Sequence, residues 1–159
     1  MELATWENCQ ADFVFDGGFI DLQVPNSGAA EWDAFWVALR SSPFELTAYR
    51  DDETYSLPDT AAKMLAEREV ASVMLSMRSG CVTANCHFFG GDLEFDIDPR
   101  EVVNEQAFES VLSIMRFVAA TAHHPVFATP EGGSVAYAFL RVNPDGQAVY
   151  LPKGSVRRN

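Results

Sequence analysis

Residues 71–98, with the sequence ASVMLSMRSGCVTANCHFFGGDLEFDID, contain three apolar runs separated by two turns that contain glycine. In the first and third runs the apolar side chains recur at every second position: Val73, Leu75 and Met77, then Leu93, Phe95 and Ile97. This alternation is typical of strands with one buried face. Turns at Ser79-Gly80 and Gly90-Gly91 would place consecutive strands side by side. The stretch therefore predicts an antiparallel meander of three strands, with the middle strand at 82–89.

Two long segments on either side of the meander have helical spacing. Their apolar residues recur three or four positions apart: Trp32, Phe35, Trp36 and Leu39 in the first, and Phe108, Val111, Leu112, Met115 and Val118 in the second. Asn104 precedes the second segment in the position of an N-cap. We predict helices between Ser27 and Ser42 and from 104 to about 122, and a shorter helix at 59–69 with Asp59 as its N-cap.

Further alternating segments predict strands outside the meander. Two short strands joined by an Asp-Gly-Gly turn are expected between Phe13 and Val24, one strand each at 44–49 and 126–129, and a hairpin from 135–142 and 148–151. Runs of strands with helices between some of them indicate an α+β fold. We expect a single domain over 1–152, with a mainly antiparallel sheet and two longer helices packed on one face. Residues 153–159 would form a basic, flexible tail.

The net charge of −12 is unevenly distributed along the 159 residues. Residues 1–109 contain 21 of the 23 acidic residues but only 6 of the 11 basic ones. An acidic surface repels nucleic acid phosphates and anionic lipid headgroups, so we expect neither direct nucleic acid binding nor membrane binding. A basic protein partner is favoured instead, although acidity can also serve solubility alone.

The chain shows no signal for a membrane span or for secretion. No run approaches the roughly 18 apolar residues that a membrane span needs, and the first residues lack the basic start of a signal peptide. Three cysteines, Cys9, Cys81 and Cys86, cannot all pair within one chain, which fits a reducing compartment. We therefore expect a cytoplasmic protein.

Four acids alternate with the apolar residues of the third meander strand: Asp92, Glu94, Asp96 and Asp98. A calcium loop of the EF-hand type is excluded, because its sixth and twelfth positions, counted from Asp92, hold Ile97 and Val103. Paired carboxylates can hydrolyse glycosides, but no aromatic platform is spaced to hold a sugar. The four acids form either a solvated face or a partner-binding stripe, and the loop acids Asp51, Asp52 and Glu53 are a second candidate patch.

The cysteines and histidines do not form a recognisable catalytic or metal-binding motif. Cys81 and Cys86 are five positions apart and would point to opposite faces of a strand, so we expect structural, buried cysteines. Cys86 and His87 are adjacent and would face apart, which disfavours a nucleophilic pair. His123 and His124 would interact with the carbonyl end of a helix. We expect no metal, no cofactor and no catalytic residue.

One segment, residues 111–131 with the sequence VLSIMRFVAATAHHPVFATPE, resembles small bacterial immunity proteins of the polymorphic-toxin kind. In that family an amphipathic helix runs into Lys-Pro-Val and then into a strand that ends Thr-Pro-Glu-Asn. Pro125-Val126 and Thr129-Pro130-Glu131 match, whereas His124 replaces the lysine and Gly132 the asparagine. The resemblance implies a single-domain α+β protein, encoded beside a secreted antibacterial toxin, that binds and blocks this toxin in the cytoplasm.

Three functions therefore remain in view. The first is an immunity or antitoxin-like protein that occludes the active site of a basic protein toxin. The second is a phage or mobile-element protein that mimics nucleic acid and inhibits a nuclease. The third is a small hydrolase or metal-binding protein that uses the histidines or the acids.

Overall fold

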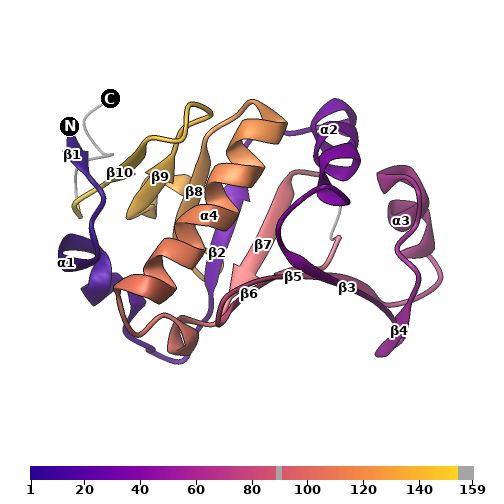
Figure 1. The fold of residues 1–159 in the computed structure, drawn as a ribbon, viewed down its shortest axis with the longest axis horizontal. Coiled ribbons are helices and arrows are strands. Elements are labelled where there is room, and N and C mark those ends of the chain that lie inside the picture. Colours follow the sequence, from indigo (N-terminus) through magenta and orange to yellow (C-terminus); the bar gives the residue numbers. More distant parts are fainter. Residues whose placement is uncertain (89–90, 154–159) are drawn as a thin grey trace.

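The computed structural model describes residues 1–88 and 91–153. These residues form one antiparallel sheet with the strand order β1-β10-β9-β8-β2-β7-β6-β5-β3-β4 (Figure 1). The strands are β1 (Glu2–Leu3), β2 (Ile20–Val24), β3 (Glu45–Arg50), β4 (Glu53–Tyr55), β5 (Val73–Ser79), β6 (Val82–Cys86), β7 (Leu93–Ile97), β8 (Val126–Pro130), β9 (Leu140–Val142) and β10 (Ala148–Tyr150). The helices are α1 (Trp6–Cys9), α2 (Ala29–Leu39), α3 (Ala61–Glu67) and α4 (Glu105–Ala122), with 3-10 turns η1 (Gln10–Phe13), η2 (Pro99–Glu101) and η3 (Val135–Tyr137).

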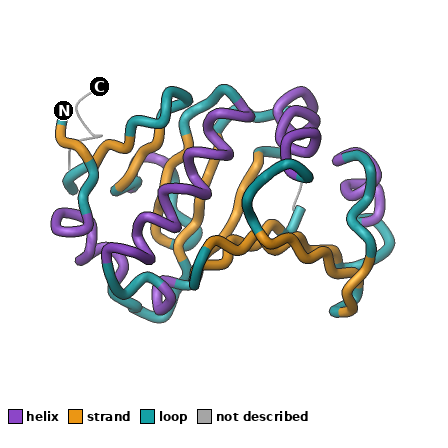
Figure 2. Tube along the Cα trace, in the orientation of Figure 1, coloured by secondary structure: helices purple, strands orange, loops and turns teal. Residues whose placement is uncertain are grey.

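The α+β architecture confirms the sequence-based prediction. Helix α4 crosses the middle of the sheet and packs against β5, β6, β8 and β9, and α2 packs beside α4 (Figures 1 and 2). On the central strands the side chains that face these helices are buried, whereas most of the alternate side chains are partly exposed. The two longer helices therefore cover one face of the sheet.

The predicted meander is present as β5, β6 and β7, but the middle strand predicted at 82–89 is shorter, because β6 ends at Cys86 and the backbone bends at Phe88. Met77 pairs with Ala84, which in turn pairs with Ile97, so the apolar positions of all three strands share the helix-covered face. Gly80 has a φ of +58° in the turn between β5 and β6, a conformation that favours glycine. The predicted turn at Gly90-Gly91 includes Gly90, which lies outside the described residues.

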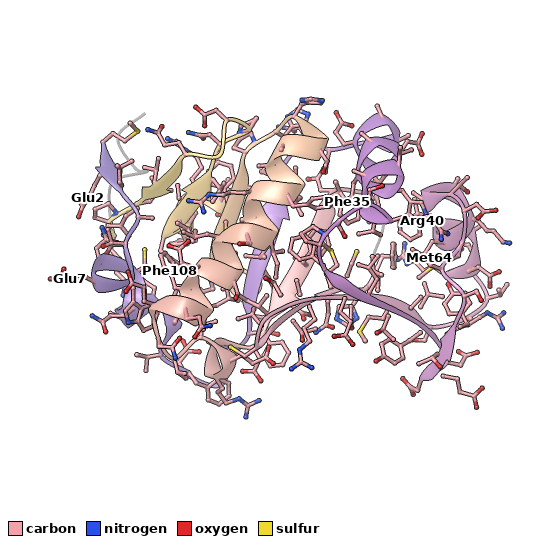
Figure 3. The ribbon with its side chains drawn as sticks, viewed as in Figure 1. Glu2, Glu7, Phe35, Arg40, Met64 and Phe108 are labelled. Atoms are coloured by element: carbon pink, nitrogen blue, oxygen red, sulfur yellow. The ribbon has the colours of Figure 1, made fainter. Side chains whose placement is uncertain are left out.

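Aromatic side chains fill the space between the helices and the sheet. Phe35 of α2 contacts Phe95 of β7 and Phe117 of α4, with ring centroids 5.6 and 6.2 Å apart. Phe108 of α4 contacts Phe13, which lies at the end of η1. Figure 3 shows Phe108, Phe35 and Met64 spread along the molecule from the α1 end to the α3 end. Burial of such large side chains is the main term that stabilises this arrangement.

The helix ends follow local capping chemistry. The Asn104 side chain accepts a hydrogen bond from the backbone N–H of Ala107 at 2.8 Å, as expected for the N-cap of α4. The cap predicted for α3 is wrong by one residue. Thr60, not Asp59, accepts from the backbone N–H of Lys63, because α3 begins at Ala61.

Several short elements differ from the predictions. Of the two strands predicted between Phe13 and Val24 only β2 forms, because Phe13 ends the 3-10 turn η1 and is buried among aromatic rings instead of pairing in the sheet. The first part of the predicted hairpin is η3, and only β9 and β10 pair. Strands β1 and β4 at the two edges were not predicted. None of the helices in the described part of the chain is long and apolar enough to cross a membrane.

Candidate functional site: the open face of the sheet

The face of the sheet opposite α2 and α4 carries mostly polar side chains. We call this surface the open face and define it by residues that alternate with the core positions of five strands: Thr47 and Tyr49, Met74 and Ser76, Asn85 and His87, Glu94 and Asp96, and Asp21 and Gln23. Strand periodicity explains this composition, because successive side chains point to opposite faces. The pairing of β2 with β7 places acidic side chains from both strands on the open face.

Three acids from two neighbouring strands meet at the centre of the open face. Asp21 of β2 is the cross-strand partner of Asp96, and Glu94 lies two positions before Asp96 in β7. Burial raises the pKa of Asp21 above its usual range, and the negative charges of Asp96 and Glu131 raise it further. The pKa of Glu94 is also raised, first by burial and then by the charges of Asp21, Asp96 and Asp92. Burial and neighbouring negative charges therefore dominate the electrostatics of Asp21 and Glu94.

The turn after β8 holds Asp21 in place. Asp21 is only 8% exposed, and its Oδ2 accepts a hydrogen bond from the backbone N–H of Gly132 at 2.8 Å. Nε2 of the Gln23 side chain donates to the carbonyl oxygen of Gly133 at 2.6 Å and to Oγ1 of Thr129 at 2.8 Å. This turn begins at Glu131, the last residue of the segment that carries the resemblance to immunity proteins.

His87 extends this polar network toward β6 and β5. Its Nε2 lies 2.9 Å from Oδ2 of Asp96, and Oγ of Ser76 donates to Oδ1 of Asn85 at 2.7 Å. The next residue, Phe88, has a φ of +57°, which is strained for a bulky side chain. Its ring is held against Trp32 and Trp36, so aromatic packing maintains the backbone bend directly after His87.

The acids predicted from the third meander strand divide into two groups. Glu94 and Asp96 lie on the open face within β7, and exposed Asp92 immediately precedes that strand. Asp98 instead forms a forked ion pair with Arg100, with Nη2 to Oδ2 at 2.8 Å, and this contact lowers the pKa of the carboxyl. Asp98 therefore contributes less uncompensated charge than Glu94.

The second predicted patch lies beside the open face. Asp51 and Asp52 form the two-residue turn between β3 and β4, and Glu53 begins β4. Asp51 is fixed to Ser72 by two hydrogen bonds, with its backbone N–H donating to the Ser72 carbonyl and its Oδ1 accepting from the Ser72 backbone N–H. Asp52 lines a hollow together with His87, and His87 contacts Asp96 of the first patch, so His87 links the two predicted patches.

Three adjoining hollows cross the open face. The first, of about 30 Å³, is lined by Asp21, Asn85, His87, Glu94, Phe95 and Asp96. The second, of about 290 Å³, is lined by Tyr49, Asp52, Ser72, Met74 and His87. The third, of about 210 Å³, is lined by Glu45, Thr47, Tyr49, Ser76, Arg78 and Thr83. Neighbouring hollows share His87 or Tyr49, so they form one groove across the strands.

Asp21 and His87 were not among the predicted site residues. The alternation of Ile20, Leu22 and Val24 would have placed Asp21 opposite the core, but β2 is remote in sequence from the acids of β7. For His87 the sequence indicated only that it faces away from the adjacent Cys86. Its pairing with Asp96 depends on the register between β6 and β7.

The thiols and the remaining histidines lie away from this groove. Cys9 and Cys86 are buried, and burial raises the pKa of the Cys86 thiol to about 12. The prediction of a buried Cys81 is wrong, because this residue is exposed beside the turn between β5 and β6. His123 ends α4 in a left-handed conformation, and Nε2 of His124 lies 3.0 Å from Oε1 of Glu31. Within 1–88 and 91–153, no group of three or more metal-binding side chains comes together.

Comparisons with models of known protein families, with curated proteins and with solved structures give no match to this chain.

Proposed function

We propose that this chain is an immunity (antitoxin-like) protein that binds a basic protein toxin through the acidic part of the open face. The observation that carries the proposal is the cluster of Asp21, Glu94 and Asp96 on neighbouring strands, in which burial and then the charges of nearby acids raise the pKa values of Asp21 and Glu94. A cation from a partner would relieve this repulsion. The toxin's active site would be occluded, and binding would take place in the cytoplasm.

Two further features support a binding role. The acids lie on regular strands and in turns that are hydrogen-bonded to neighbouring strands, so a partner meets a surface that is already ordered. The resemblance of residues 111–131 to immunity proteins concerns α4, β8 and the turn that caps Asp21. The segment that suggests the family therefore borders the acidic cluster.

A growth-rescue assay tests the proposal. The protein encoded beside this chain would be expressed in a sensitive bacterium, with the wild-type chain, with E94K/D96K, or with D33K/E69K. The two double variants change the net charge equally, but Asp33 and Glu69 are exposed on α2 and after α3, away from the open face. We expect rescue by the wild type and by D33K/E69K, and a loss of rescue by E94K/D96K.

The rates of association would be measured with the same variants. Charge reversal on the open face should lower the on-rate, and the difference should shrink as salt is added. Equal rescue by both double variants would show that the acidic cluster is not part of the interface. Failure of the wild type to rescue, or a partner that proves to be a host nuclease, would count against the immunity function.

A further inference from the structure

The largest of the three hollows has a chemistry of its own. Tyr49 of β3 and Met74 of β5 are cross-strand partners, so their half-buried side chains lie together on the open face. Asp52 and His87 complete the hollow with Ser72. No lysine or arginine is among the described residues that line it. The hollow therefore combines the phenol ring of Tyr49 and the thioether of Met74 with one carboxylate, one imidazole and one serine.

The nearest arginine in sequence does not neutralise Asp52. Arg50 lies one position after Tyr49 and therefore points to the opposite face of β3. Its Nε donates to Oε2 of Glu67 in α3 at 2.8 Å. The side chain of Asp52 is exposed, so its carboxylate remains available to a cation that enters the hollow from solvent.

The backbone at Asp52 is unusual for an acidic residue. Asp51 and Asp52 have φ values of +50° and +65°, and Arg50 pairs with Glu53, which defines a two-residue hairpin loop. Such loops commonly have asparagine or aspartate at the first central position and glycine at the second, which Asp52 occupies here. An aspartate here retains backbone strain that glycine would remove, and strain of this kind is concentrated at functional positions. The two hydrogen bonds between Asp51 and Ser72 hold the strained turn at the rim of the hollow.

We propose that this hollow receives one arginine side chain of the basic partner, an assignment that rests on the proposed function. The methylene stem would lie against Met74, the guanidinium would stack on the ring of Tyr49, and its N–H groups would donate to the carboxylate of Asp52. Arginine fits better than lysine because its planar, weakly hydrated cation stacks on aromatic rings and binds carboxylates through two parallel bonds. An apolar anchor would cover Asp52 without supplying a hydrogen-bond donor, which is unfavourable.

The methyl groups of isotope-labelled methionines provide a direct test. The full-length protein would be titrated with N-acetylarginine N-methylamide, and the methyl resonances followed by NMR. We expect a saturable shift of Met74, whereas Met64, Met77 and Met115, which are 0% exposed, should not move. The neutral citrulline analogue, which has nearly the same shape, should bind more weakly.

Matched variants locate the charge and the ring. D52N removes the carboxylate and keeps a residue that tolerates the left-handed conformation, and D51N is the control in the same turn. We expect D52N to lower the affinity for the arginine probe by about two- to fivefold, the range of an exposed ion pair, and D51N to leave this affinity unchanged. Y49L should lower the affinity for the probe by a similar factor, because the stacked ring is lost.

Equal binding of the arginine and citrulline probes, or tighter binding of the norleucine analogue, would overturn the assignment of a cation. Equal binding of the lysine analogue would overturn the preference for arginine. If E94K/D96K abolishes rescue but Met74 of the wild type does not respond to the arginine probe, the assignment of the hollow is wrong. The proposed function would stand in that case. The converse result, a response of Met74 with no rescue by the wild type, would support the arginine site in the hollow and count against the immunity function.

Discussion

Nε2 of His87 lies 2.9 Å from Oδ2 of Asp96, across the boundary between β6 and β7. His87 directly follows β6 and Asp96 lies within β7, and both residues alternate with the core positions of these strands. Because His87 also lines the hollow with Asp52, this contact joins the acidic centre of the open face to its aromatic end. The strength of the contact can be measured directly.

Truncation of both partners measures the coupling between His87 and Asp96. We expect a double-mutant cycle with H87A, D96A and H87A/D96A to give a coupling of about 0.5–1 kcal/mol, because the side chains are 34% and 21% exposed. Urea denaturation of the four proteins supplies the free energies of unfolding. If the changes in the free energy of unfolding are strictly additive, the contact between His87 and Asp96 does not stabilise the protein.

The acidic centre should make the pH dependence of stability run opposite to that of an ordinary ion-paired carboxylate. The pKa of Asp21 is raised in the folded protein, first by burial and then by Asp96 and Glu131, against the hydrogen bond from Gly132. Between its usual pKa and this raised value, the folded state binds more protons than the unfolded state. The contribution of Asp21 to stability therefore increases as the pH falls through that interval.

The variant D21N isolates this effect, because its amide oxygen can still accept the hydrogen bond from Gly132. We expect D21N to be more stable than the wild type at pH 7 by a fraction of a kcal/mol. The difference should vanish toward about pH 4, where carboxylates take up protons. Paired denaturation curves at these pH values check it. A variant that is less stable at pH 7 would show that the charge itself is favourable.

The turn between β5 and β6 requires glycine for two reasons. Gly80 has a φ of +58°, and a Cβ at this position would lie 2.9 Å from Oγ of Ser110 in α4. We expect G80A to destabilise the protein by about 1–2 kcal/mol, from the left-handed backbone and from displacement of the Ser110 hydroxyl. Thermal denaturation measures the loss.

Two further variants separate these contributions. Gly132 has a φ of +70°, and a Cβ at this position would meet no atom within 4 Å, so G132A reports backbone strain alone. We expect G80A/S110A to be more stable than G80A, because it removes the oxygen that the new methyl group meets. If S110A does not improve G80A at all, the contact with α4 has no influence on this turn.

The four acids around β7 should contribute unequally to partner binding. Asp98 is paired with Arg100, whereas Glu94 is close to three other acids. We therefore expect E94Q to weaken binding of the proposed basic partner more than D98N does, with the larger loss at low salt. Surface plasmon resonance at two salt concentrations would compare them. A larger effect of D98N would move the interface toward η2.

The sequence by itself determined the parts of this protein that depend on local periodicity and local capping. Alternating apolar residues defined the first and third meander strands, and Leu93, Phe95 and Ile97 placed Glu94 and Asp96 on the opposite face. Apolar residues three and four apart defined α2 and α4. Very short elements such as β1 and β4 escaped prediction, because two or three residues do not establish a period.

Only the tertiary structure decided which distant residues meet. Asp21 lies beside Asp96 because β2 pairs with β7, and Asp52 shares a hollow with His87 because β3 pairs with β5 and β5 with β6. The physical reason is that the order of strands in a sheet is set by packing of the whole core and by loop closure, which no local pattern encodes. The four acids around β7 could be found in the sequence, whereas the groove lined by Glu94 and Asp96 exists only in the folded chain.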